Sequence, residues 1–161
     1  MPQRVAIVTG GTRGIGRAIA GRLCRDGFAL VLSARGEESA RETAEELRRD
    51  GFSVRGVGAD ARKDEDQARL VRTAVSEFGR LDALVNNAGV GAWGRIDELS
   101  PERFRDVLET NLFGAYYAIR HAVGPMKKGG GGFIVNIASL AAVNAFAGGA
   151  AYNASKFGLL G

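Results

Sequence analysis

A tyrosine and a lysine stand four residues apart near the end of the sequence, at Tyr152 and Lys156. On a helix, residues at this spacing lie on one face, so an ammonium group would lie beside the phenol. A neighbouring positive charge favours the phenolate and lowers a tyrosine pKa from its usual value of about 10, which makes the residue usable as a general acid or base. Such pairs are common on ordinary helices, so the interpretation depends on what surrounds this one.

Asn111 lies within the apolar stripe of a predicted helix instead of on its polar face. The stripe residues recur at spacings of three and four, at Phe104, Leu108, Asn111, Ala115, Ala118 and Ala122. A buried amide must find hydrogen-bond partners. A catalytic role and a structural hydrogen bond to neighbouring backbone fit this pattern equally well. His121, the single histidine, has no acidic or cysteine partner nearby in the sequence and is interpreted as a structural or surface residue.

A glycine-rich stretch, TGGTRGIG, runs from Thr9 to Gly16 between an apolar run and a helical pattern. Glycines at a strand-to-helix turn let backbone N–H groups and the positive end of the helix approach a pyrophosphate. Gly10, Gly14 and Gly16 are placed for this, although their spacing differs from the general fingerprint G-x-G-x-x-G. A tight turn without a ligand is the alternative.

The end of the second predicted strand carries no carboxylate. In NAD-binding folds an Asp or Glu there meets the ribose 2′-hydroxyl, whereas this chain reads Ser33, Ala34, Arg35. Arg35 and Arg13 could instead bind the 2′-phosphate of NADP through guanidinium hydrogen bonds. Each arginine alone could equally be a solvated surface charge, so the pair and the missing carboxylate together predict NADP.

Short apolar runs alternate with helical periodicity along the chain, and this alternation predicts the fold. We predict strands over 5–8, 29–33, 52–59, 81–85 and 133–138. We predict helices after the glycine turn, over 37–50 and 64–78, as one long helix from Ser100 and Pro101 onward, and from Ala150. Such repetition is typical of an α/β, doubly wound parallel sheet of the Rossmann type, whose ligand crevice lies at the carboxyl ends of the strands.

Composition excludes several classes of protein. The 161 residues allow one domain, and a net charge of +4 with no run of more than two basic residues argues against a nucleic-acid partner. No apolar stretch approaches the ~20 residues of a membrane span. The single cysteine, Cys24, lies in an apolar helical pattern and is expected to be an inert core thiol in a cytoplasmic protein. No cluster of Cys and His has metal-ligand spacing, so no metal site is expected.

Together these motifs make the whole chain resemble the short-chain dehydrogenase/reductase family. The glycine turn, the sequence NNAG from Asn86 to Gly89, Asn111, Ser139 and the Tyr152–Lys156 pair occur in the family's order. The glycine spacing and NNAG resemble the compact oxidoreductase branch, with 3-oxoacyl carrier-protein reductases as the nearest likeness. The resemblance implies an NADP-dependent hydride transfer between nicotinamide and a carbonyl or secondary alcohol.

The resemblance implies a role for each matching residue. Tyr152 would exchange the proton with the substrate, Ser139 would hydrogen-bond the substrate oxygen, Lys156 would hold the nicotinamide ribose and lower the tyrosine pKa, and Asn111 would position a water of a proton relay. Asp60 would meet the adenine amino group. The implied cofactor-binding set is Gly10, Thr12, Arg13, Gly14, Ile15, Gly16, Arg35, Asp60, Ala61, Asn87, Ala88, Gly89, Tyr152 and Lys156.

The family normally continues beyond the point that corresponds to Gly161, with a sixth and a seventh strand and substrate-covering helices. We therefore expect residues 1–161 to be a single NADP-binding domain from the amino-terminal portion of a longer enzyme, with a fifth strand that forms an apolar sheet edge. The activity of these residues alone is doubtful. A truncated or catalytically silent nucleotide-binding protein is the alternative.

The substrate is the main open question. The resemblance implies a small carbonyl or alcohol compound, such as a 3-oxoacyl thioester, and a homodimer or homotetramer at full length. Residues 90–96 follow NNAG and could border the substrate pocket. Trp93, within that stretch, could equally be a packing or subunit-contact residue.

Overall fold

In the computed structural model, which describes residues 2–161, one parallel sheet has five strands in the order β3-β2-β1-β4-β5. The strands are β1 (Val5–Val8), β2 (Ala29–Ala34), β3 (Val54–Gly58), β4 (Ala83–Asn86) and β5 (Phe133–Asn136). The helices are α1 (Gly14–Arg25), α2 (Glu37–Arg49), α3 (Asp64–Phe78), α4 (Pro101–Leu108), α5 (Gly114–Lys128) and α6 (Ala150–Leu160), with the short turns η1 (Glu109–Phe113) and η2 (Leu140–Ala142). The predicted doubly wound α/β fold is confirmed.

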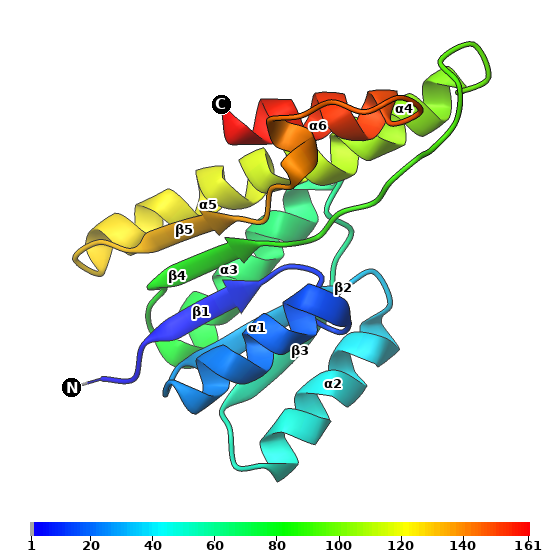
Figure 1. The fold of residues 1–161 in the computed structure, drawn as a ribbon. Coiled ribbons are helices and arrows are strands. Elements are labelled where there is room, and N and C mark those ends of the chain that lie inside the picture. Colours follow the sequence, from blue (N-terminus) through cyan, green and yellow to red (C-terminus); the bar gives the residue numbers. More distant parts are fainter. Residues whose placement is uncertain (1) are drawn as a thin grey trace.

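The sheet separates two layers of helices (Figure 1). Successive side chains of a strand point to opposite faces, so β1 supplies both cores. Val5 and Ile7 pack with the core under α3 and α5, while Ala6 and Val8 pack with the core under α1 and α2. Cys24 of α1 is buried in the second core, where burial raises the pKa of its thiol. Both faces of the central strands are therefore apolar, as a covered parallel sheet requires.

Four predicted strands have different bounds in the structure, and β2 differs only by ending one residue later, at Ala34. β3 starts at Val54 because the Phe52 N–H donates to Leu47 O and closes the turn after α2. β4 starts at Ala83, and the preceding Asp82 carboxylate accepts the Val5 N–H at the amino end of β1. β5 ends at Asn136, and only the Ile137 N–H extends the ladder by donating to Asn86 O.

The predicted long helix is interrupted, which corrects the expectation of one continuous element. Its start is as expected, because the Ser100 hydroxyl accepts the Arg103 N–H at 3.3 Å and Pro101 occupies the first turn. After Leu108, however, the chain forms the π-helical turn η1 before α5 begins at Gly114. Asn111 lies inside this wider turn, a feature that often accompanies functional positions.

β5 forms one edge of the sheet and pairs only with β4 among the described residues. Phe133 is 78% exposed, and Ile134 and Val135 are 39% and 47% exposed. The expected apolar edge is therefore present. Within residues 2–161, none of the helices combines the length and the apolar character needed to cross a membrane.

Candidate active site

The carboxyl ends of the strands open into a cleft of about 680 Å³, a size within the range of about 300–1,000 Å³ typical of cofactor and small-molecule sites. Twelve of the residues expected to bind the cofactor line it: Gly10, Thr12, Arg13, Gly14, Ile15, Gly16, Arg35, Asp60, Ala61, Asn87, Ala88 and Gly89. The turns after β1, β2, β3 and β4 supply them, and Figure 1 shows these strands ending on the same side of the sheet. Tyr152 and Lys156 are not part of this lining.

The glycine turn has a backbone that side chains would obstruct. Gly10 and Gly14 adopt φ of 64° and 53°, in the left-handed region that favours glycine. A Cβ on Gly16 would collide with the Gly10 carbonyl oxygen and with Asn87 Nδ2. The N-terminal turn of α1 has no side-chain cap. Its first N–H groups therefore remain available to an anionic ligand.

Thr9 and Asn87 fasten the glycine turn to the end of β4. The Thr9 hydroxyl accepts the N–H groups of Asn87 and Ala88, each at 3.0 Å. In return, Asn87 Nδ2 donates to the carbonyl oxygens of Thr9 and Gly10 at 2.9 and 3.0 Å. The Asn87 side chain is thus used for structure, and the cleft-facing groups of NNAG are mainly backbone.

The glycine turn and the end of β2 present positive charge to the cleft. Arg13 and Arg35 are exposed, line the cleft and form no ion pair with any residue in the described part of the chain. The nearest carboxylate in sequence, Glu37, turns away, because its Oε2 accepts the Gly58 N–H at 2.6 Å. This arrangement leaves one cationic donor in the glycine turn and one at the end of β2, where no carboxylate competes.

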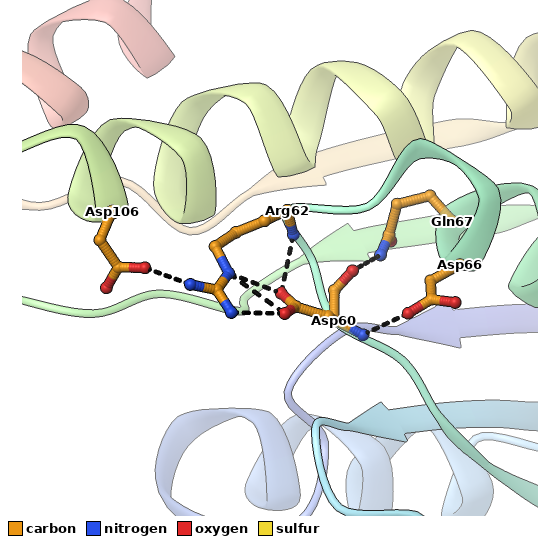
Figure 2. Close-up of polar contacts among 5 residues, drawn as sticks. All are labelled: Asp60, Arg62, Asp66, Gln67 and Asp106. Atoms are coloured by element: carbon orange, nitrogen blue, oxygen red, sulfur yellow. Dashed lines mark hydrogen bonds and ion pairs between the residues drawn. The ribbon is translucent and has the colours of Figure 1, made fainter. Parts of the chain in front are cut away.

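Asp60 lies in the cleft just after β3, and Figure 2 shows its carboxylate against the Arg62 guanidinium. Arg62 Nη2 donates to Asp60 Oδ2 at 2.6 Å, and Arg62 Nη1 donates to Asp106 Oδ1 of α4, also at 2.6 Å. The hydrogen bond from the Arg62 side chain, opposed in part by burial, holds the pKa of Asp60 below its usual range. Asp60 is therefore an ionised acceptor at neutral pH.

Asn111 is almost fully buried and connects three parts of the site. Its Oδ1 accepts the Val90 N–H at 2.8 Å, and its Nδ2 donates to Val90 O at 2.9 Å and to Ser155 Oγ at 3.0 Å. Val90 lines the cleft, and Ser155 lies on α6 between the tyrosine and the lysine. The sequence left two roles open for Asn111, a catalytic one and a structural hydrogen bond to backbone. The structure shows hydrogen bonds of the second kind, to Val90.

Tyr152 and Lys156 lie on the same face of α6, as their spacing predicts. Lys156 Nζ is 5.7 Å from the centroid of the Tyr152 ring and donates to Ile137 O, just beyond β5, at 2.7 Å. The lysine is only 5% exposed, and burial lowers the pKa of its ammonium group. The ammonium group thus ties α6 to the end of the fifth strand.

Ser139 is the N-cap of η2, and its Oγ accepts the Ala141 N–H at 3.1 Å. The turn η2 packs against α6, so the structure brings all four expected catalytic residues to the region where α6 meets η1 and the end of β5. Among residues 2–161 no group of three or more His, Cys, Asp or Glu side chains could hold a metal ion.

Sequence reasoning missed two residues of this region. Ser155 is fully buried, accepts from Asn111 and donates to Tyr152 O at 2.8 Å, so it links η1 to the tyrosine's own turn. The second residue is Arg62, whose guanidinium donates to the Asp60 carboxylate. The position of a small polar residue between Tyr152 and Lys156 is a sequence signal for Ser155. No local pattern could reveal that Arg62 has a partner on α4.

Comparisons with known proteins agree with this geometry. The sequence model of the family described as short chain dehydrogenase matches residues 4–161. The chain belongs to this family. Dehydrogenase/reductase SDR family member 4 of the rabbit, Oryctolagus cuniculus, is 39% identical over 162 residues, which cover 100% of this chain and 62% of the rabbit protein.

Two solved structures have folds close to that of this chain. A variant of actinorhodin polyketide ketoreductase, solved with NADPH, has a TM-score of 0.94 and 41% identity, with 99% of this chain and 63% of that chain covered. A metagenomic short-chain oxidoreductase in complex with NADP has a TM-score of 0.92 and 38% identity, with 99% and 72% covered. The chain thus spans about 60% of the length of the curated relatives of the family.

Proposed function

We propose that this short-chain dehydrogenase is the cofactor-binding part of an NADP-dependent oxidoreductase that acts on a carbonyl or secondary alcohol. The observation that carries the proposal is the cleft, in which a backbone-lined glycine turn lies beside Arg13 and Arg35 with no carboxylate at the end of β2. An NADP-type dinucleotide fits these residues: a pyrophosphate suits the N-terminus of α1, and a 2′-phosphate suits the two arginines. The complexes of relatives with NADPH and NADP support this choice.

Bound nicotinamide would supply or accept the hydride, and the residues of the chain would orient the reactants and manage the proton. In our proposal Tyr152 gives its phenolic proton to the substrate oxygen during reduction and takes it back during oxidation. Ser139 donates a hydrogen bond to the same oxygen as negative charge develops there. Its hydroxyl hydrogen is free for this purpose, because towards Ala141 the Ser139 oxygen acts as an acceptor.

Lys156 and Asn111 would support the tyrosine from either side. We propose that the Lys156 ammonium group, already beside the Tyr152 ring, also binds the nicotinamide ribose hydroxyls. Asn111 uses both amide hydrogens within the protein, but its Oδ1 accepts only the Val90 N–H. A carbonyl oxygen has two lone pairs, so Oδ1 retains capacity for the water of a proton relay.

The limits of the domain and its assembly belong to the same proposal. Residues 1–161 would form one NADP-binding Rossmann-like domain within a longer enzyme, since they match about 60% of the relatives' length. The exposed edge at β5 would be covered in that enzyme. We further propose that this enzyme is a homodimer or homotetramer and that its substrate is a small carbonyl or alcohol compound. We also propose a cytoplasmic location, because the one cysteine is a buried free thiol.

Turnover tests the reaction separately from binding. NADPH oxidation is followed by nicotinamide absorbance while the longer enzyme that contains residues 1–161 is mixed with a panel of ketones and 3-oxoacyl thioesters. We expect oxidation with at least one carbonyl substrate, and we expect the reaction to require Tyr152. NADPH binding without oxidation by any member of the panel would instead favour a catalytically silent nucleotide-binding protein, the second candidate, in which Lys156 only ties α6 to Ile137.

A further inference from the structure

Asp60 is held by hydrogen bonds at its backbone as well as at its carboxylate (Figure 2). Its N–H donates to Asp66 Oδ2 at 2.9 Å, and its carbonyl oxygen accepts from Gln67 Nε2 at 3.2 Å, both at the start of α3. Its carboxylate accepts four hydrogen bonds from three groups of Arg62: one from the backbone N–H, two from Nε and one from Nη2. Neither the backbone nor the carboxylate of Asp60 can turn without breaking several of these bonds.

Arg62 is in turn held by a second carboxylate. Its Nη1 donates to Asp106 Oδ1 of α4, 44 residues along the chain. With one edge of the guanidinium on Asp60 and the third nitrogen on Asp106, the planar group has its orientation set at both ends. One guanidinium serving two carboxylates leaves a net charge of −1 on the three groups.

The three residues differ in their access to the cleft. Asp60 lines it, whereas Arg62 and Asp106 are not part of the lining. Asp60 Oδ1 accepts from Arg62 N and Nε, and Oδ2 accepts from Nη2 and shares Nε. The two carboxylate oxygens have about four lone-pair sites and receive three donor hydrogens, because Nε is shared between them. The carboxylate therefore retains capacity for one more donor, and the net negative charge favours a donor over an acceptor.

We propose that Arg62, anchored by Asp106, is a positioning residue that aims the Asp60 carboxylate at the exocyclic amino group of the cofactor's base and thereby makes this end of the cleft selective for adenine. The inference rests on the proposed function, since it assumes a dinucleotide in the cleft. Hypoxanthine carries an oxygen where adenine carries the amino group. That oxygen would face an anionic acceptor, so the deamino cofactor is bound more weakly.

The test compares the dissociation constants of NADPH and of deamino-NADPH, which contains hypoxanthine, by calorimetric titration of the full chain. We expect wild-type protein to prefer NADPH by about tenfold, the size of one hydrogen bond to a charged group. Arg62→Gln should reduce this ratio to within about threefold of unity, and Asp106→Asn should reduce it partly. The matched control is Arg72→Gln, which removes an exposed ion pair with Glu65 on α3 and should keep the wild-type ratio.

The ratio separates positioning from a merely structural role. A loss of stability alone would weaken both nucleotides equally and leave the ratio unchanged, which would overturn the inference. Equal binding of both nucleotides by the wild-type protein would also overturn it and leave the proposed function standing. Binding of neither nucleotide would overturn both. Should Arg62→Gln fail to fold, Asp106→Asn alone decides, because the bonds of Arg62 to Asp60 remain in that variant.

Discussion

Lys156 is almost fully buried. Within the described residues, its ammonium group has one hydrogen-bond acceptor, the Ile137 carbonyl. Burial disfavours the charged form of a lysine and lowers its pKa. The neighbouring Tyr152 ring packs on Trp93, with centroids 5.1 Å apart. At the scale of single residues, the proposed catalytic pair is therefore held by a few named contacts, each of which can be removed.

Replacing Tyr152 by Phe should separate turnover from binding. The variant keeps the ring packed on Trp93 and loses only the hydroxyl group. We expect turnover to fall by about 10²- to 10⁴-fold, the usual contribution of a general acid or base, while the dissociation constant of NADPH changes little. Tyr116→Phe, on exposed α5 surface, is the matched control for loss of a phenolic hydroxyl. Turnover retained in Tyr152→Phe would refute the assigned role.

Burial of Lys156 also makes a prediction about the pH dependence of stability. Because the pKa is lowered in the folded state, the unfolded chain binds the Lys156 proton more tightly. Unfolding free energy therefore rises with pH between the lowered folded pKa and the unfolded value of 10.5. Urea unfolding should show wild-type protein gaining stability relative to Lys156→Met across this window. A difference that does not vary with pH would contradict the burial of this charge.

At the scale of elements, the strands, the helices and the side of the sheet that carries the site could be predicted from the sequence, because each rests on local periodicity or on a glycine turn. The interruption of the long helix at η1 could not. It accompanies hydrogen bonds from Asn111 to Val90 and Ser155, 21 and 44 residues away. His121 likewise pairs with Asp64 at 2.9 Å, 57 residues away, although the sequence showed no nearby partner.

The close approach of α1 to the glycine turn predicts opposite effects for two glycines of one helix. Gly16→Ala should lower the unfolding free energy by about 1–3 kcal/mol, since its Cβ would collide with the Gly10 backbone. It should also abolish NADPH binding. In Gly21→Ala the added Cβ would contact only the ends of the Arg17 and Arg25 side chains, so this substitution should raise the unfolding free energy by about 0.5–1 kcal/mol. Urea titration measures both, and equal effects would argue against the tight turn.

At the scale of the whole molecule, the exposed edge at β5 is the feature most open to partners. Its strand is short and apolar, and only β4 pairs with it among the residues described. Unpaired strand edges of this kind template association with other chains. The chain is therefore expected to self-associate through β5 unless further sequence covers the edge.

Sedimentation velocity can test this expectation. Wild-type protein should show concentration-dependent association, and Ile134→Lys should shift it towards the monomer, because a lysine on an edge strand opposes pairing. Val75→Lys, at an exposed apolar position of α3, adds the same charge away from the edge and should leave association unchanged. If both substitutions act alike, net charge and not the edge controls the assembly.

The central claim is that the cleft binds an NADP-type dinucleotide through Arg13 and Arg35, and its most direct test is the ratio of the dissociation constants for NADPH and NADH. We predict that wild-type protein binds NADPH about tenfold or more tightly, since a hydrogen bond to a charged group contributes about 1.5–3 kcal/mol. Replacing both arginines by Gln should bring the ratio to about one and leave NADH binding nearly unchanged. Equal affinities of the wild-type protein for the two nucleotides would contradict the account.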